Sequence, residues 1–426
     1  ERAESAKAPF QSIYHFLKAN SLFEYYQSNA YQIRNREIEE NDTSDFNFWG
    51  QQRFLKEIHT LFSKALDTNE NLHLDDQSIR ILFEKDSLSS YQGLALNDWM
   101  ATKAIEFYFF QPYQSLIQWK NENGIWNWED FSQQDFSSDN GYNRKHGLVI
   151  LQQMGEKARN SGSKELITFW ELHRLKALSN LNLKNKDQNL IQAYRHLLDN
   201  PDIQQSPLKL ALAFKLNSLS NDYGYQQSNQ FENAKVEAHQ LASEIINSGE
   251  KNLEAAQAKS LIQLIEQPSI DGQIQSFIMP ETHSRVLVSY ANIKEINIRI
   301  YKPTTRQWLS LNNIYVKPDM SEALDKIEPV RSWNQGLPQQ DDFNIHSTEL
   351  LIEPLQKGQY TIAFYSSQEP QELLGFAHFQ VSELMLADLG NDVFNHFALV
   401  NRENGEAISG AKIQFFDGNS PFRVAD

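Results

Sequence analysis

The hydrophobic pattern of this 426-residue chain changes at Pro268, and the change limits the folds open to it. Before this proline, apolar residues recur mainly at the spacing of three and four residues that gives a helix one buried face. After it, short runs such as Glu295–Tyr301 alternate apolar and polar side chains, as strands with one buried face do. The sequence therefore predicts a multidomain chain in which a helical region precedes β-sandwich units.

The region before Pro268 is predicted to be all helical, over residues 1–270. One apolar stripe at helical spacing consists of Phe54, Ile58, Leu61, Phe62 and Ala65. Later candidate helix starts lie near Lys164, Asp187, Pro207, Asn229 and Lys251. Paired, they give units of about forty residues, a length typical of stacked helical-hairpin repeats. Because no repeat consensus is legible, we leave open a solenoid-like domain, an irregular bundle, and a division into two subdomains near residue 162.

After Pro268 the sequence predicts an antiparallel β-sandwich over residues 271–382 and the start of a second one over residues 383–426. The expected strands are 274–279, 285–290, 295–301, 348–352, 359–366 and 375–381. Residues 310–338 are expected to form a long inserted loop with some helix. In the second unit, a hairpin-like turn at Asn401–Gly405 leads to a strand at Gly410–Phe416. Two strands are only marginally stable alone, so we expect this domain to be incomplete here or to lean on the preceding sandwich.

Composition limits the partners of the chain. Its net charge of -16 repels phosphate backbones, so we expect no nucleic-acid binding. No apolar run approaches the length that spans a bilayer, so we expect membrane attachment only through a lipid anchor outside this chain. The chain has no cysteine, which excludes disulfides, thiolate metal sites and a cysteine nucleophile within it. It opens at Glu1 without a signal-like segment, and we expect it to be processed or trimmed.

One segment combines aromatic rings with carboxylates. It contains Trp119, Trp126, Trp128, Glu129 and Asp130. Rings beside acids could stack on a sugar and hydrogen-bond it, or cleave a glycoside if two carboxylates faced each other. The alternative, which we favour, is an aromatic loop fixed onto the helical core with its acids in water. Trp126, Trp128 and Glu129 are our candidates for contact with a partner or a glycan.

Other chemistry is not indicated by the sequence. The eleven histidines are scattered and form no His-Glu-x-x-His motif. Asp67–Asn71 resembles the start of a calcium loop, but Leu72 and Ser78 stand where such a loop needs glycine and glutamate. Glycine-rich phosphate loops and nucleophile elbows are also missing from the sequence. We therefore expect no metal, no cofactor and no catalytic residue in this chain, and we expect it not to be an enzyme.

Several segments resemble one protein family. Arg285–Tyr301 resembles the first macroglobulin-like domain of large bacterial alpha-2-macroglobulin proteins, especially the Bacteroidetes type. His346–Ile352 together with Leu355–Tyr360 resembles the paired strands that close that domain, and Phe379–Leu384 resembles its exit. Leu399–Ile413 is similar to the opening of the next domain, with Ala407 where proline is usual. Leu96–Phe107 resembles a helix in the helical N-terminal region of these proteins.

The resemblance implies a large, envelope-associated protein that traps or inhibits proteinases. In this family a bait region is cut, a conformational change follows, and in many members an internal thioester captures the attacking proteinase. That thioester requires a Cys-x-Glu-Gln motif, so its chemistry lies outside this cysteine-free chain. The resemblance therefore implies a non-catalytic N-terminal arm. It also implies a periplasmic or outer-membrane-associated location, with target proteinases as partners of the full-length protein.

A second hypothesis is an outer-membrane-associated, helical-repeat lipoprotein that binds glycans. The solenoid-like helix spacing and the Trp119–Asp130 segment support it, whereas the long β region is more than such a binder needs. A hydrolase is the least favoured of the three hypotheses, because no nucleophile or acid/base constellation emerges from the residues. The oligomeric state, the target proteinase and the role of the helical domain stay open at this point.

Overall fold

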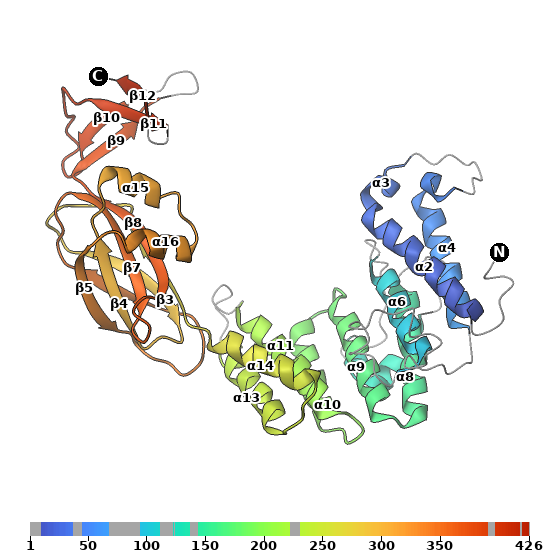
Figure 1. The fold of residues 1–426 in the computed structure, drawn as a ribbon. Coiled ribbons are helices and arrows are strands. Elements are labelled where there is room, and N and C mark those ends of the chain that lie inside the picture. The colour runs from blue at the N-terminus through green and yellow to red at the C-terminus, as the bar shows by residue number, and fades with distance from the viewer. Residues whose placement is uncertain are drawn as a thin grey trace. The chain divides into compact units, whose positions relative to one another are not determined.

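The computed structural model describes residues 10–36, 45–67, 94–110, 122, 124–136, 144–221, 231–390, 397–417 and 420–425. The chain divides into two compact units. The first unit comprises Glu1–Lys215 and Leu241–Lys259, and the second comprises Leu216–Gln240 and Ser260–Asp426. The expected order, a helical region followed by β domains, is confirmed (Figure 1). The domain boundaries expected at residues 162, 270 and 382 stay predictions.

Helices form the described chain up to Glu266. They are α2 (Phe10–Ser28), α3 (Ala30–Arg34), η1 (Phe46–Phe48), α4 (Gln51–Leu66), α6 (Leu96–Phe110), η3 (Gly124–Trp126), α7 (Trp128–Ser132), α8 (Arg144–Ser161), α9 (Lys164–Ser179), α10 (Lys186–Leu198), α11 (Gln205–Asn221), α13 (Ala234–Asn247) and α14 (Leu253–Glu266). The candidate starts near Lys164, Asp187 and Pro207 coincide with α9, α10 and α11 to within two residues. The candidate start at Asn229 lies outside the described residues.

The predicted apolar stripe of α4 is confirmed, because Phe54, Ile58, Leu61, Phe62 and Ala65 are all buried. The stripe packs on α2, and aromatic rings make much of the contact. The ring of Phe16 from α2 lies 6.1 Å from that of Phe62 and 4.5 Å from that of Trp99 of α6, measured between centroids. Tilted aromatic pairs at these distances add to the stabilisation that burial provides.

Strands follow α14, which ends two residues before Pro268 because proline cannot continue a helix. The elements are β1 (Ser269–Ile274), β2 (Phe277–Ile278), β3 (Ser284–Ala291), β4 (Glu295–Tyr301), α15 (Thr305–Leu311), α16 (Lys317–Leu324), β5 (Pro329–Gly336), β6 (His346–Ile352), β7 (Gly358–Ser366), β8 (Leu373–Val381), β9 (Leu384–Asp388), β10 (Phe397–Asn401), β11 (Ile413–Asp417) and β12 (Ser420–Ala425). Residues 269–381 form a three-stranded sheet, β1-β3-β6, and a five-stranded sheet, β2-β8-β7-β4-β5. Every pairing is antiparallel except that of β2 with β8.

The two sheets face each other across one apolar core. Val286 and Val288 of the three-stranded sheet and Ile298 of the five-stranded sheet are completely buried in it. Ile298 is paired with Phe364 of β7, whose ring reaches across to β1. A Cβ atom at Gly272 of β1 would lie 2.4 Å from that ring, so the close approach of strand and ring requires glycine there.

The outer face of the five-stranded sheet is covered as well. Met320 and Leu324 of α16 are completely buried against Tyr301, Ala363 and Tyr365 of the sheet. The sequence prediction of one wet face per strand is therefore wrong for β7, in which Thr361 and Ala363 are as buried as the residues facing the sandwich core. In β4 the predicted alternation holds from Ile296 to Ile300, where the isoleucines are buried and Asn297 and Arg299 are only half-buried, but Tyr301 at its end is buried under α16.

The positions of two strands, β5 and β1, differ from the prediction. β5 lies within the predicted loop 310–338, which also contains α15 and α16. Its residues alternate between half-buried and exposed, so it has no deeply buried side chain to give a strong strand signal. β1 (Ser269–Ile274) lies mostly before the predicted strand 274–279 and shares only Ile274 with it. Of the remaining predicted residues, Phe277–Ile278 form the short strand β2, which pairs with β8.

The second β unit pairs differently from the expected hairpin. The turn at Asn401–Gly405 is present, with the Gly405 amide donating to the Asn401 carbonyl at 2.9 Å. However, β10 pairs with β9 and β11 with β12. The two sides of the turn are joined by the bridge between Val400 and Ala407 and by backbone hydrogen bonds from Asn401 to Glu406 and from Ile408 to Leu399. Within the described residues, no helix is long and apolar enough to cross a membrane.

The opposed sheets make Ile298 a test of the sandwich. Ile298→Ala removes a completely buried side chain from the centre of β4 and should destabilise this unit by about 2–5 kcal/mol. The matched change Val330→Ala, on a β5 side chain that is 51% exposed, should alter stability by less than about 0.5 kcal/mol. Urea unfolding followed by hydrogen exchange in β4 and β7 peptides measures both. Equal effects of the two substitutions would contradict the sandwich core.

Candidate functional site

The aromatic segment predicted from the sequence is packed between helices of the first unit. Trp126 ends η3, and Trp128 and Glu129 begin α7. The Asn127 side chain caps α7 by accepting from the Asp130 amide at 2.8 Å. Gln152 of α8 donates to two carbonyl oxygens at the other end of α7, each at 2.9 Å. Side chains of neighbouring helices thus satisfy the backbone of this short segment.

The structure gives the three candidate residues different surroundings. Trp126 is 5% exposed, so its ring faces offer no open surface for a sugar. Trp128 is half-buried against α8, where a Cβ atom at Gly155 would lie 2.4 Å from the ring, and the Arg159 guanidinium lies 3.8 Å from the ring centroid. Glu129 is exposed. Trp119 lies outside the described residues. The packing favours the core-fixed loop, and partner or glycan contact by these residues stays a prediction.

A buried ion pair, which the sequence prediction missed, holds the aromatic segment in place. Arg174 and Glu171 of α9 are each 1% exposed, and Arg174 Nη2 lies 2.6 Å from Glu171 Oε2. The same guanidinium donates to the carbonyl oxygens of Ile125 at 2.8 Å and Trp126 at 3.0 Å. Arg159 also pairs with Glu171. The one sequence signal was two opposite charges three residues apart on a helix with a broad apolar surface.

Electrostatics keep Glu171 ionised in this buried position. Burial acts to raise the pKa of Glu171, but the attraction and hydrogen bonds of Arg174 and Arg159 outweigh it and hold that pKa below its usual value. A buried charge pair of this kind contributes little net stability compared with an apolar pair. Its effect is directional, because it fixes η3 and α7 to α9 through named hydrogen bonds. The arrangement is consistent with a structural role.

A second cluster of titratable groups joins α4, α6 and α8. His59 Nδ1 lies 2.6 Å from the hydroxyl oxygen of Tyr108. The ring of His146 stacks on Tyr108 at 5.3 Å and lies 4.9 Å from that of His59. Burial, with repulsion from His146, lowers the pKa of His59 to about 4, so this imidazole is neutral at pH 7.

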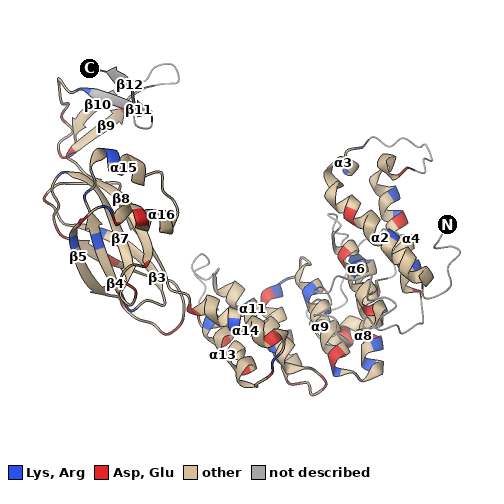
Figure 2. Ribbon diagram, viewed as in Figure 1, with Lys and Arg blue, Asp and Glu red and all other residues tan. Residues whose placement is uncertain are grey.

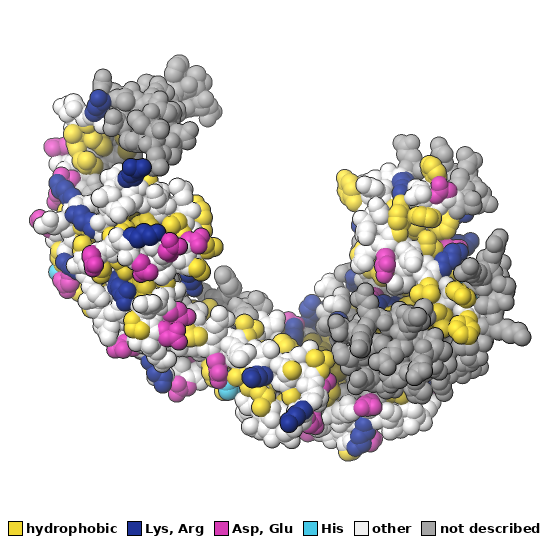
Figure 3. All heavy atoms as spheres, viewed as in Figure 1, with side chains coloured by type: hydrophobic (Ala, Val, Ile, Leu, Met, Phe, Trp, Pro, Cys, Tyr) yellow, Lys and Arg dark blue, Asp and Glu magenta, His cyan; other side chains and the backbone are white. Residues whose placement is uncertain are grey.

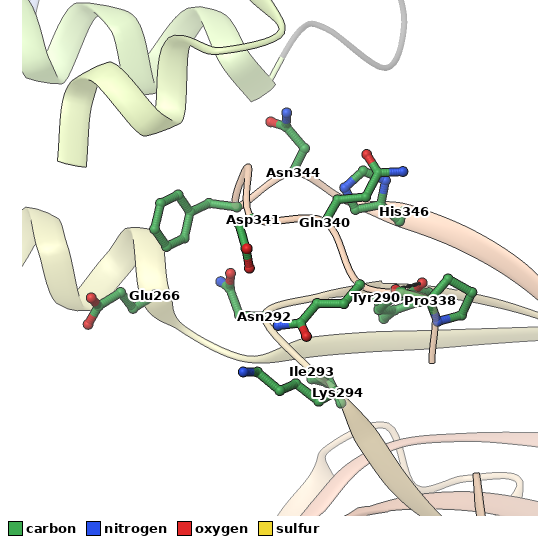
Figure 4. Close-up of a pocket in the computed structure, with 12 residues that line it drawn as sticks. Glu266, Tyr290, Asn292, Ile293, Lys294, Pro338, Gln340, Asp341, Asn344 and His346 are labelled. Carbon is green, nitrogen blue, oxygen red and sulfur yellow. Dashed lines mark hydrogen bonds between the residues drawn. The ribbon is translucent and has the colours of Figure 1, made fainter. Parts of the chain in front are cut away.

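A pocket lies at the edge of the sandwich in the second unit (Figure 4). Its volume is about 260 Å³. The lining comes from the end of α14, the end of β3 with the β3–β4 connection, and the segment between β5 and β6 with the start of β6. It includes Glu266, Asn292, Lys294, Gln339, Asp341 and His346. In Figure 4 the Asp341 side chain points from its loop toward the β3–β4 connection, which carries Asn292 and Lys294. No sequence motif indicated this site.

The walls of the pocket are held by hydrogen bonds to the helices of the same unit. Asn292 has φ +59° and donates from Nδ2 to the carbonyl oxygens of Ile265 at 2.8 Å and Gln267 at 3.1 Å. Phe343 has φ +58°, and its ring stacks on His239 of α13 with centroids 4.8 Å apart. Left-handed backbones are unusual for residues other than glycine. They persist where surrounding contacts fix them.

Further polar contacts fasten the segment before β6 to α13 and to the residues just before it. The Asn344 side chain, 4% exposed, donates to the Glu232 carbonyl at 2.8 Å. Lys235 donates to the Phe343 carbonyl at 3.2 Å, and burial lowers the pKa of Lys235 although Asp342 acts to raise it. Burial acts to raise the pKa of Asp342, but hydrogen bonds from His346 and Asn344 outweigh it and lower that pKa overall. Among the described residues, no three His, Asp or Glu side chains are placed to hold a metal ion.

Over the described residues, charges of both signs are mixed. Acidic and basic residues are interspersed along the helices and strands (Figure 2). On the face of the sandwich shown in Figure 3, hydrophobic, acidic and basic side chains alternate within short distances. The absence of nucleic-acid binding, expected from the net charge of -16, stays a prediction.

Comparison with known proteins gives a distant likeness. No protein-family model and no curated protein matches the chain. Among solved structures, Escherichia coli alpha-2-macroglobulin spanning domains MG0-NIE-MG1 is 13% identical, with a TM-score of 0.29 over 37% of this chain and 54% of that one. This chain thus spans about half of that structure. A second structure of the same protein, spanning NIE-MG1, is 16% identical, with a TM-score of 0.30 over 38% of this chain and 82% of that one. Scores of this size do not show a shared fold.

The buried ion pair gives a first prediction for the helical unit. Arg174→Met leaves Glu171 buried with Arg159 as its remaining partner and frees two carbonyl oxygens, so it should destabilise the unit by about 3 kcal/mol. Lys326→Met, which breaks an exposed pair with Glu322, is the control and should cost less than about 1 kcal/mol. Thermal unfolding measures both, and faster hydrogen exchange in residues 124–132 is expected only for Arg174→Met. Equal stability of the two variants would contradict the anchoring role.

The His59 cluster gives a pH prediction. The pKa of His59 falls from 6.5 to about 4 on folding, so the unfolded chain binds this proton more readily between those values. Stability from the neutral imidazole is therefore complete above pH 6.5 and is lost as the pH falls toward 4. His59→Gln keeps an acceptor for Tyr108 and should reduce the slope of melting temperature against pH. The exposed control His196→Gln should not. Identical slopes for both variants would refute the assignment.

Proposed function

We propose that this chain is the non-catalytic N-terminal arm of an envelope-associated alpha-2-macroglobulin-like proteinase inhibitor. One observation supports this most directly. Residues 269–381 form a two-sheet sandwich, and further strands begin at Leu384, immediately after it. The segment Arg285–Tyr301, which resembles one macroglobulin-like domain, lies in the sandwich. The segment Leu399–Ile413, which resembles the opening of the next such domain, lies in the second β unit.

The physical character of the described parts suits a scaffold. The central strand β7 of the five-stranded sheet is buried on both faces, by the opposite sheet and by α15 and α16. In the helical unit, buried charges are used to hold segments in place, as with Arg174 and the carbonyl oxygens of Ile125 and Trp126. Fixed packing of this kind transmits position between neighbouring domains. In this proposal the arm holds the trapping domains in place, and target proteinases meet other parts of the full-length protein.

The proposal also includes a location. An inhibitor of this class would act in the periplasm or at the outer membrane, attached if at all through a lipid anchor outside these residues. The interspersed surface charges of both signs and the net charge of -16 suit a protein that stays soluble between membranes. Fractionation of cells that produce the natural protein would place it in the periplasm or the envelope fraction.

A comparison of three proteins tests the function. The full-length natural protein, a variant of it without residues 1–426, and this chain alone are each mixed with trypsin. Cleavage of casein is then measured. We expect the full-length protein to reduce cleavage and this chain alone to have no effect, because the chain has no cysteine for a thioester. The truncated variant should inhibit less than the full-length protein. Failure of the full-length protein to inhibit any of a set of serine, cysteine and metalloproteinases would overturn the proposal.

A further inference from the structure

The pocket of the second unit is lined by side chains of opposite charge. Lys294 and Asp341 both line it, and within the described part of the chain neither side chain has a hydrogen-bond or ion-pair partner. The two lie on different walls, Lys294 on the β3–β4 connection and Asp341 on the segment before β6 (Figure 4). The side-chain amide of Gln339, which also lines the pocket, adds one donor group and one acceptor. The pocket therefore offers a cation, an anion and an amide together.

The walls that carry these groups are held in an uncommon conformation. Four described residues other than glycine have positive φ, and two of them, Asn292 and Phe343, line this pocket. A left-handed backbone is rare for a bulky side chain such as Phe343. Such conformations concentrate at ligand clamps, where surrounding contacts maintain them. Here the contacts are the stacking on His239 and the hydrogen bonds of Asn292, so the walls are set before any ligand arrives.

The lining selects among ligand classes. An anion would meet the carboxylates of Asp341 and Glu266, and a simple cation would leave Lys294 without a counter-charge. A neutral sugar would leave both charges unpaired. A ligand with an ammonium and a carboxylate group satisfies both, through charge-assisted hydrogen bonds that are stronger than neutral ones. The volume of about 260 Å³ restricts that ligand to a small molecule.

We propose that this pocket binds a small zwitterion, an amino acid or a dipeptide. The ligand carboxylate pairs with Lys294, the ligand ammonium pairs with Asp341, and Gln339 hydrogen-bonds the atoms between them. Tyr290 also lines the pocket, and its hydroxyl donates to the Pro338 carbonyl, which holds the start of the Gln339 segment. The proposal does not depend on the inhibitor function. It concerns this chain alone, so either proposal can fail without the other.

Titration of the full 426-residue chain tests the ligand class. The probes are L-alanine and L-alanyl-L-alanine, together with the N-acetylated and the C-amidated dipeptide, each followed by isothermal calorimetry at low salt. We expect saturable binding of at least one of the two zwitterions, and which of them binds more tightly separates a free amino acid from a peptide. Blocking either terminus should weaken binding by about tenfold or more. Equal binding of the blocked forms, or no binding of either zwitterion, would overturn the proposal.

Variants locate the binding. Lys294→Gln and Asp341→Asn should each weaken the better zwitterion by about tenfold. Both side chains are exposed, so the melting temperature should stay the same and unfolding would not explain the loss. The control Lys326→Gln changes an exposed lysine on the same unit outside the pocket and should bind like the unaltered chain. If Lys294→Gln and Asp341→Asn bind like this control, the zwitterion does not occupy this pocket and the proposal fails.

Discussion

The arrangement of strands in the second unit depends on β7, the central strand of the five-stranded sheet, which is buried on both faces. This strand faces the opposite sheet with Ile362 and Phe364 and the helices α15 and α16 with Thr361 and Ala363, all of them completely buried. A strand in this position cannot shift by one residue without exchanging its two environments, so its register is fixed. The fixed register then determines where β4 and β8 lie on either side of it.

In the helical unit, order at the aromatic segment comes from buried polar groups and not from apolar packing alone. Arg174 reaches carbonyl oxygens 48 and 49 residues earlier in the chain, and those oxygens would otherwise be buried without donors. The guanidinium suits this task because its fork of donors can serve Glu171 and two carbonyl groups at once. Because the pair adds little net stability, its value lies in specifying one arrangement of η3 and α7 over others.

Sequence patterns predicted what local periodicity encodes and missed what depends on distant parts of the chain. The stripe of α4 and the alternation of β4 were predicted because burial there follows the period of the element. β5 was missed because this edge strand alternates only between half-buried and exposed side chains, which gives a weak hydrophobic pattern. The covered face of β7 was missed because nothing in the sequence of α16 indicates the strand on which it packs. Arg174 and the pocket could not be predicted for the same reason. Their partners are separated by many residues, and only the fold brings them together.

The pocket and the attachment of the helices to the sandwich are one physical system. The left-handed backbone of Phe343 costs about 1–3 kcal/mol, which the contacts with α13 must offset. Those contacts, from His239, Lys235 and the Glu232 carbonyl, all belong to the helical side of the second unit. Loss of them would relax the segment that carries Asp341 and open the pocket wall. By linkage, any ligand that prefers the intact pocket also favours the contacts that Glu232, Lys235 and His239 make with the segment before β6. Occupancy of a site this small would therefore stabilise the contacts of residues 232–239 with the segment before β6, all within the second unit.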